Sequence, residues 1–309
     1  MMRIPPLLPG EHVYSGFVRG RYLSAQMHVS DKVFFELNQL PYHWLRSQTP
    51  LCDNLNAVIA RMAHSEEEQF QLRLWHTPFA AWLLSLPVDM EPQALTESGV
   101  RNNMEESPFN VDRRWKFCPQ CAQADRSEFG VSYWHSSHQL LGARVCWRHQ
   151  CELHSHENLR YLAFKLPHHF LSDSEPLMID SQWQRDWQSF IYRLSAHLQH
   201  NVEWARSVSN LIKTHLGITG MVKHSHRQLF NVMFEQMQCD IGLDCLSGLF
   251  TRYARQNGRQ PNILWLTLSG YSQARGLHHP LYWLAILFWL RHRLPELGFL
   301  NENRVICSK

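Results

Sequence analysis

Apolar residues recur at intervals of three and four along most of the chain, and this spacing predicts a mainly α-helical protein. In the first third, the pattern indicates helices that begin near His12, after Ser30, near Asn54 and after Ser65, and an apolar helix over residues 79–86. The side chain of Ser30 is suited to cap the first turn of a helix. Glu66, Glu67 and Glu68 suit the positive end of the dipole of the helix that starts near Ser65. We therefore expect a helical N-terminal domain over residues 1–90.

Proline, glycine and polar residues then interrupt the pattern. They indicate a linker over residues 91–114 and, after a central module, a helical C-terminal domain over residues 181–309. The run 281–290 is apolar throughout but far shorter than the ~20 residues of a membrane-spanning helix, so it predicts a buried helix. The stretch from Trp204 to Leu216 and from Gln228 onward is either a helix-turn-helix unit or two helices that only pack in the core.

Two pairs of metal-binding residues lie in the central module. Cys118-Pro-Gln-Cys121 and Cys146-Trp-Arg-His149 each separate their two ligands by two residues. Because a turn of this length directs both side chains at one point, the four residues form a closed Cys₃His set, as in structural zinc sites. We expect one structural Zn²⁺ in a zinc-ribbon-like module over residues 115–165. A closed set leaves no open position at which the metal could activate water.

Neighbouring residues leave alternatives open. Cys151 could replace His149 as the fourth ligand and give a Cys₄ site, although the spacing of His149 mirrors that of the first pair more closely. His135 and His138 lie between the two ligand pairs, three residues apart. They form either a second metal site or, as we favour, a pair that packs and makes hydrogen bonds.

Composition narrows the class of protein. The chain has 309 residues, of which 44% are hydrophobic and 12% aromatic, so it can bury a substantial core. Its net charge of +3 is too small for binding nucleic acid through bulk charge. It has no apolar segment typical of a secretory signal, and eight cysteines that include metal spacing fit a reducing compartment. We expect a cytoplasmic protein that does not bind membranes.

The motifs that the chain lacks argue against catalysis. It has no phosphate-binding P-loop, no HExxH and no GxSxG. A binding or adaptor protein is therefore favoured over an enzyme. A zinc-dependent enzyme and an unrelated DNA-binding regulator remain the other hypotheses.

Several segments occur in an order typical of one family. Pro9-Gly10-Glu11-His12-Val13-Tyr14-Ser15 leads into the first helix, and His76-Thr77 precedes an apolar stretch. Further along come Phe117-Cys118-Pro119-Gln120-Cys121, Trp134-His135, His138-Gln139-Leu140 and Cys146 to His149. This series, over about residues 5–155, resembles the TniQ/TnsD family of transposition target-selection proteins.

The second ligand pair departs from the family pattern. Family members commonly have Cys-Pro-x-His-Gly at this point, whereas this chain has Cys146-Trp147-Arg148-His149-Gln150. The ligands are kept and the turn residues are not, so we expect a differently shaped turn. Some members carry a second zinc site just downstream, but His154-Ser155-His156 stands there in this chain, and we expect no second ion.

The resemblance implies a non-catalytic adaptor that recruits the AAA+ regulator TnsC. Short members, of the TniQ type, dock on an RNA-guided Cascade complex in CRISPR-associated transposons, often as a homodimer. Long members, of the TnsD type, bind attachment-site DNA through an extended C-terminal region. The length of this chain favours the TniQ type, although it also fits the N-terminal part of a longer TnsD protein.

Basic residues supply candidates for binding nucleic acid or a partner protein, because guanidinium and ammonium groups pair with phosphate. The alternative for each is a solvated surface position or an internal salt bridge. We expect Arg252, Arg255 and Arg259 to share one face of a helix, since they repeat at intervals of three and four. The remaining candidates, on the first helix and around the ligand pairs, are Arg19, Arg21, Arg113, Arg114, Lys116, Arg144 and Arg148.

Overall fold

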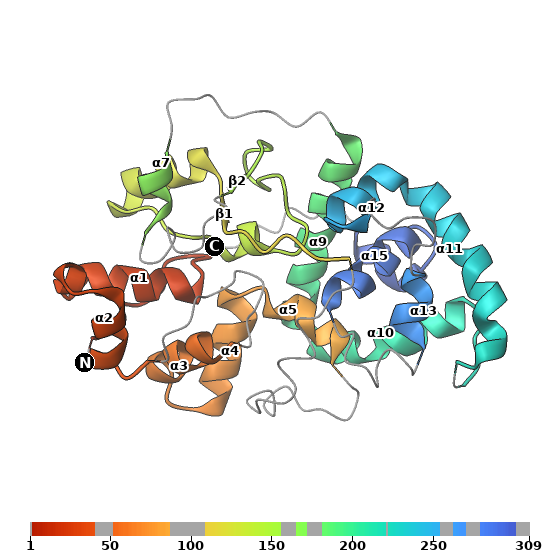
Figure 1. Cartoon of the computed structure of the whole chain (residues 1–309), viewed down its shortest axis with the longest axis horizontal. Coiled ribbons are helices and arrows are strands. Elements are labelled where there is room, and N and C mark those ends of the chain that lie inside the picture. Colours follow the sequence, from red (N-terminus) through yellow and green to blue (C-terminus); the bar gives the residue numbers. More distant parts are fainter. Residues whose placement is uncertain are drawn as a thin grey trace.

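The computed structural model describes residues 2–40, 52–86, 109–155, 165–171, 181–220, 222–253, 262–269 and 279–300. Within them the protein is mainly helical, as the sequence predicts, with one two-stranded sheet. The N-terminal helices gather at one end of the long axis and the C-terminal helices at the other (Figure 1). No helix in these residues is long and apolar enough to cross a membrane.

Local capping explains where the N-terminal helices start. The side chain of Ser30 accepts a hydrogen bond from Val33 N–H, and Ser65 and Glu68 form a reciprocal capping box. Ser30 therefore caps α2 as predicted, and the structure adds a cap at Ser65. The elements are α1 (Val13–Leu23), η1 (Gln26–His28), α2 (Asp31–Leu37), α3 (Asp53–Met62), α4 (Glu66–His76), α5 (Phe79–Trp82) and η2 (Leu83–Ser85).

The central segment contains the sheet and few long helices. Strand β1 pairs with β2 in antiparallel register, Lys116 opposite Ser155 and Phe117 opposite His154. This pairing joins the chain just before the first ligand pair to the chain just after the second. The elements are β1 (Lys116–Phe117), α7 (Pro119–Phe129), η4 (Ser136–Gln139), β2 (His154–Ser155) and η5 (Pro167–Phe170).

The C-terminal helices surround α15, whose residues are all buried, as the apolar run 281–290 predicts. In α9 and α10, one face is apolar and buried and the other is polar, which is the usual pattern at a surface. The elements are α9 (Gln182–His200), α10 (Val202–His215), η6 (His224–His226), α11 (Arg227–Ile241), α12 (Leu243–Leu249), α13 (Ile263–Leu268), α15 (Pro280–Leu290) and η8 (Pro295–Leu300).

The candidate helix-turn-helix in this region is not supported. Residues 216–226 separate α10 from α11, whereas a helix-turn-helix joins its helices through three or four residues. These are therefore two separate helices of the C-terminal core. A connection of the right length occurs instead between α3 and α4, over residues 63–65.

Two clusters of buried apolar residues hold the fold together. One unites α1, α2 and α3 with Trp115 and Trp134 of the central segment. The other joins α5, the four central cysteines and the C-terminal helices. At Gly142, whose φ is +72°, an added Cβ would lie 2.7 Å from Trp187 Nε1, so only glycine lets α9 approach this closely. The central segment is therefore part of both cores.

The opening segment of the sequence, residues 9–15, is hydrogen-bonded to the central segment through its backbone. His12 N–H donates to the carbonyl of Trp134 at 2.7 Å, and the backbones of Glu11 and His135 form an isolated antiparallel β-bridge. The carboxylate of Glu11 is fully buried and accepts two hydrogen bonds from Arg19, at 2.7 and 2.6 Å. His76 Nδ1 lies 2.8 Å from the Glu11 carbonyl, so two segments recognised separately in the sequence meet in the structure.

Two buried histidines cap helices while uncharged. His12 Nδ1 accepts from Tyr14 N–H at the start of α1, and His279 Nδ1 accepts from Leu281 N–H at the start of α15. Burial, together with a neighbouring positive group in each case, lowers the pKa of His12 and that of His279 to about 3. Each imidazole therefore remains neutral in the folded protein well below the pH at which it is protonated in the unfolded chain.

This difference predicts that acid destabilises the fold. Between pH 6.5 and 3 the unfolded chain binds protons that the folded protein does not, so stability is full above pH 6.5 and falls as the pH drops. Lowering the pH from 7 to 5 should reduce the free energy of unfolding of the protein by about 2 kcal/mol for each of these two histidines. Urea unfolding at both pH values should show that His279→Asn, which keeps a capping side chain, loses about 2 kcal/mol less than the wild type.

His292→Asn is the matched control, because His292 is exposed. This variant should follow the wild type at both pH values. An identical pH dependence for His279→Asn and the wild type would contradict a neutral, buried His279.

Candidate metal centre

The first ligand pair lies at the start of α7. Cys118 is the N-cap residue, and its Sγ accepts a hydrogen bond from Cys121 N–H at 3.5 Å. Pro119 occupies the first helical position, where its missing N–H costs nothing. Cys121 follows within the first turn and therefore faces the same side as Cys118. The first pair is thus the start of a helix and not the hairpin turn that a zinc-ribbon-like module implies.

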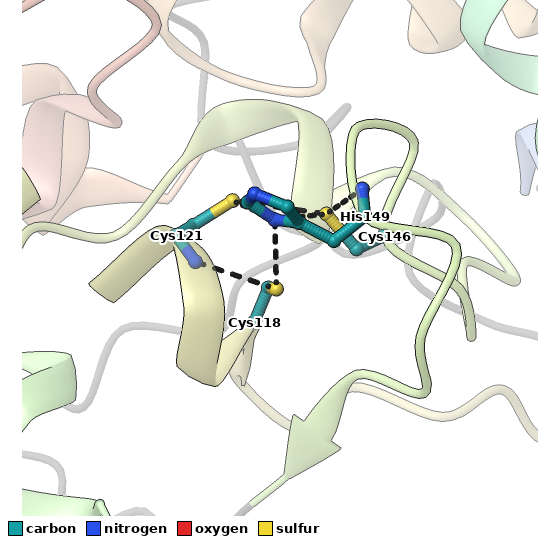
Figure 2. Close-up of side chains that lie close together, drawn as sticks. All are labelled: Cys118, Cys121, Cys146 and His149. Carbon is teal, nitrogen blue, oxygen red and sulfur yellow. Dashed lines mark hydrogen bonds between the residues drawn. The ribbon is translucent and has the colours of Figure 1, made fainter. Parts of the chain in front are cut away.

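The second ligand pair lies in a hairpin turn, as expected. The backbones of Val145 and Glu152 form an antiparallel β-bridge, and Cys146 N–H donates to the Cys151 carbonyl at 2.8 Å. Within the turn, His149 N–H donates to Cys146 Sγ at 3.4 Å. These bonds fix Cys146 and His149 on one side of the hairpin, facing α7 (Figure 2).

The four ligand atoms converge in the geometry of a tetrahedral metal site. They all lie within 4.8 Å of one another, and the three cysteines are buried. Nδ1 of His149 lies 3.3 Å from the sulfurs of Cys118 and Cys121 and 3.6 Å from that of Cys146, and Cys121 Sγ lies 3.7 Å from Cys146 Sγ. Around tetrahedral zinc, sulfur–sulfur and sulfur–nitrogen distances are about 3.8 and 3.6 Å. The residues present therefore fit this ion.

The chemistry of the cluster also calls for a cation. Hydrogen bonds from Cys121 and Cys146 lower the pKa of the Cys118 thiol to about 3, whereas the pKa of the Cys121 thiol is raised by its hydrogen bonds to Cys118 and Cys146. The pKa of the Cys146 thiol is also lowered, although its hydrogen bond with Cys118 opposes this, so a thiolate at Cys121 is the one that its neighbours oppose. A divalent ion at the focus would allow all three sulfurs to ionise.

The alternative ligands occupy nearby but different positions. Cys151 is buried with its sulfur 3.5 Å from that of Cys118, while His149 contacts all three sulfurs of the pairs, so the geometry favours His149 as the fourth ligand. His135 Nε2 lies 2.9 Å from the carboxylate of Asp125, and its ring stacks on Tyr133. His135 thus packs and makes a hydrogen bond, as we favoured. The position of His138, beside the sulfurs of Cys121 and Cys146, was missed by the sequence reasoning.

The turn residues that depart from the family pattern have clear structural roles. Trp147 stacks on Tyr192 of α9, with ring centroids 4.3 Å apart, and so joins the hairpin to the C-terminal helices. Gln150 has a φ of +55°, in the left-handed region that favours glycine, and its N–H donates to the Cys146 carbonyl at 2.9 Å. The turn therefore keeps a left-handed residue where family members have glycine.

The candidate basic residues of α1 are engaged inside the protein. Arg19 binds Glu11, and its side chain is 11% exposed. Arg21 is 3% exposed and donates to Asp31 at 2.8 Å and to the Val29 carbonyl at 2.7 Å. Both residues thus take the internal salt-bridge alternative.

Three candidates near the ligand pairs are also engaged. Lys116 is buried with its Nζ 3.6 Å from the Asp112 carboxylate, which Arg114 also binds, at 2.9 Å. Although burial opposes it, these two cations lower the pKa of Asp112 to about 2. Arg144 donates to the Gly248 carbonyl at 2.7 Å. These contacts leave fewer cations for an external phosphate than the sequence suggests.

The other candidates lie in different settings. Arg148 is exposed beside the ligand His149, and Arg113 is half-buried near His279. Arg252 is exposed, but α12 ends at Leu249, and Arg252 N–H donates to the Phe109 carbonyl in the turn that follows. The expected helical stripe is therefore wrong for Arg252. Arg255 and Arg259 lie outside the described residues.

The comparisons with known proteins give one match. The TniQ family model matches residues 2–153, which run from the segment ahead of α1 through the second ligand pair. No curated protein matches the chain.

Removal of the metal should unfold the central segment, because the ion would hold together two chain segments whose backbones are paired through a short sheet. Elemental analysis of the purified protein should find one zinc ion per chain. Cys146→Ser should lose the ion and also the near-UV circular dichroism of Trp115 and Trp134. Cys239→Ser, at an exposed cysteine, should keep both. A metal-free wild type with native spectra would contradict the site.

Replacing Gln150 by glycine should stabilise the hairpin. A non-glycine residue in the left-handed region costs roughly 1 kcal/mol, which glycine avoids. We expect Gln150→Gly to raise the free energy of unfolding by about that amount relative to Gln150→Ala, since both variants lose the Gln150 side chain and only alanine keeps the strain. Equal stability of the two variants in urea would contradict a left-handed residue at this position.

Proposed function

The chain belongs to the TniQ family through residues 2–153, and we propose that it is a non-catalytic target-selection adaptor that links an RNA-guided Cascade complex to the AAA+ regulator TnsC. The TniQ domain associates the protein with transposition. The proposal extends this to the role that short members of the family have.

The observation that carries the proposal is the TniQ domain built around a closed Cys₃His cluster. Its three cysteines are buried and its four ligand atoms face one another, an arrangement that suits a structural ion. A structural ion stabilises a scaffold and supplies no reactive water. A scaffold that holds other proteins is what an adaptor requires.

The placement of the basic residues supports docking on proteins over reading of DNA. Arg19, Arg21 and Lys116 form internal ion pairs, and Arg144 donates to a backbone carbonyl. Cations that are already paired cannot displace counterions from DNA without losing their partners. This argument favours the Cascade-linked role.

The alternative is a TnsD-type protein that binds attachment-site DNA and recruits TnsC. Arg148 favours it, because this residue is exposed next to the metal centre and can reach a phosphate.

Co-purification tests the adaptor role. The tagged chain should be expressed with TnsC and with Cascade subunits from the same source, with and without guide RNA. We expect recovery of a Cascade particle that contains guide RNA, and of TnsC. Cys146→Ser, which removes a ligand, should recover neither, and Cys239→Ser should recover both. Failure to recover either partner with the zinc-loaded wild type would contradict the adaptor role.

The salt dependence of DNA binding separates the two candidates. With few unpaired cations near the metal centre, the chain should release few counterions, so the slope of log K against log salt should be shallower than about −3. Arg148→Ala should weaken this residual binding more than Lys32→Ala, at an exposed lysine of α2. Sequence-specific binding by the chain alone with a much steeper slope would favour the attachment-site reader.

A further inference from the structure

We infer that His138 is a positioning residue of the metal centre, which donates a hydrogen bond from Nε2–H to the sulfurs of Cys121 and Cys146 and thereby strengthens the hold on the ion. The inference rests on the metal site described above and adds a function to a residue outside the four ligands.

The distances place the imidazole against two ligands at once. Nε2 of His138 lies 3.6 Å from Cys146 Sγ and 3.8 Å from Cys121 Sγ. The residue is 4% exposed, so water does not compete for this contact. His149, in contrast, contacts all three sulfurs of the pairs, so His138 lies beside the ligand set and not within it.

The surroundings of Nδ1 indicate which of the two ring nitrogens of His138 carries the proton. Nδ1 of His138 is buried without a hydrogen-bond partner. A neutral imidazole has one N–H donor and one acceptor. If Nδ1 carried the proton, a buried donor would be left unpaired and a lone pair would face two sulfurs. With the proton on Nε2, the donor faces the sulfurs, and the unpaired atom is only an acceptor.

The ring is fixed by the residues on both sides of it. Gln139 accepts from Lys116 N–H at 3.1 Å and donates to the Lys116 carbonyl at 2.6 Å, which clamps η4 to β1. His135, whose ring centroid lies 4.8 Å from that of His138, is held by Asp125 of α7. Because α7 also carries Cys121, donor and acceptor are positioned by one rigid unit.

The net negative charge of the zinc-bound site explains why a hydrogen bond from His138 would stabilise it. Three thiolates and one Zn²⁺ leave about one net negative charge in a buried place. Cys118 accepts from Cys121 N–H, and Cys146 accepts from His149 N–H. His138 extends this set of donors to the sulfur of Cys121. Hydrogen bonds to metal ligands orient them and tune the affinity, and their loss typically costs 10–100-fold in metal binding.

Zinc competition with a chromogenic chelator tests the inference on the full chain. His138→Phe, which keeps a ring but has no N–H, should bind zinc 10–100-fold more weakly than the wild type. His138→Gln, whose amide can place an N–H near the position of Nε2, should recover most of this loss. His292→Phe is the matched control, because His292 is exposed and takes no part in positioning His138, and it should bind zinc like the wild type.

The Co²⁺-substituted proteins provide a second measurement. Tetrahedral d–d absorption bands in every variant would show that the four ligands are intact, so that a lower affinity reflects the missing hydrogen bond. Wild-type affinity in His138→Phe, or an equal loss in His292→Phe, would overturn the inference. If His138→Phe does not fold, His138→Gln and His138→Ala are compared, and equal affinities would overturn it. A wild type that binds no zinc would instead refute the metal site itself.

Discussion

Three cysteine sulfurs and one imidazole nitrogen share a space too small for three unscreened negative charges, and the rest of the fold is arranged around this constraint. The helix start at Cys118 and the hairpin at Cys146 each direct two of these atoms at the focus. Their neighbours belong to the same apolar core as the C-terminal helices. A cation that neutralises the thiolates would therefore also fix how the central segment packs against the C-terminal helices.

The opening segment extends this dependence to the N-terminal helices. Glu11 is buried with Arg19, and the backbone of His12 is bonded to Trp134, between the two ligand pairs. His76, at the end of α4, reaches the Glu11 carbonyl. The N-terminal helices are thus attached to the central segment through hydrogen bonds, which fix their relative position more strictly than apolar contacts alone.

The helical class, the cap at Ser30, the buried run in α15 and the quartet of ligands could all be predicted, because each depends on local spacing. The helix at the first ligand pair could not, since a CxxC pair permits a helix start as well as a hairpin turn. Nor could the roles of His138 and Trp147, whose partners lie on other elements. For Arg252 the local spacing was misleading. It predicts a helical position, but α12 ends at Leu249.

The pairing of β1 with β2 has a consequence for protein synthesis. The ligands of the first pair are already made when Cys121 leaves the ribosome, but the strand that closes the site ends at Ser155. The opening segment likewise lacks its partner until Trp134 has emerged, because His12 N–H donates to the Trp134 carbonyl. In synthesis, the N-terminal helices therefore precede the segment that anchors them, and the site can close only after Ser155 has emerged.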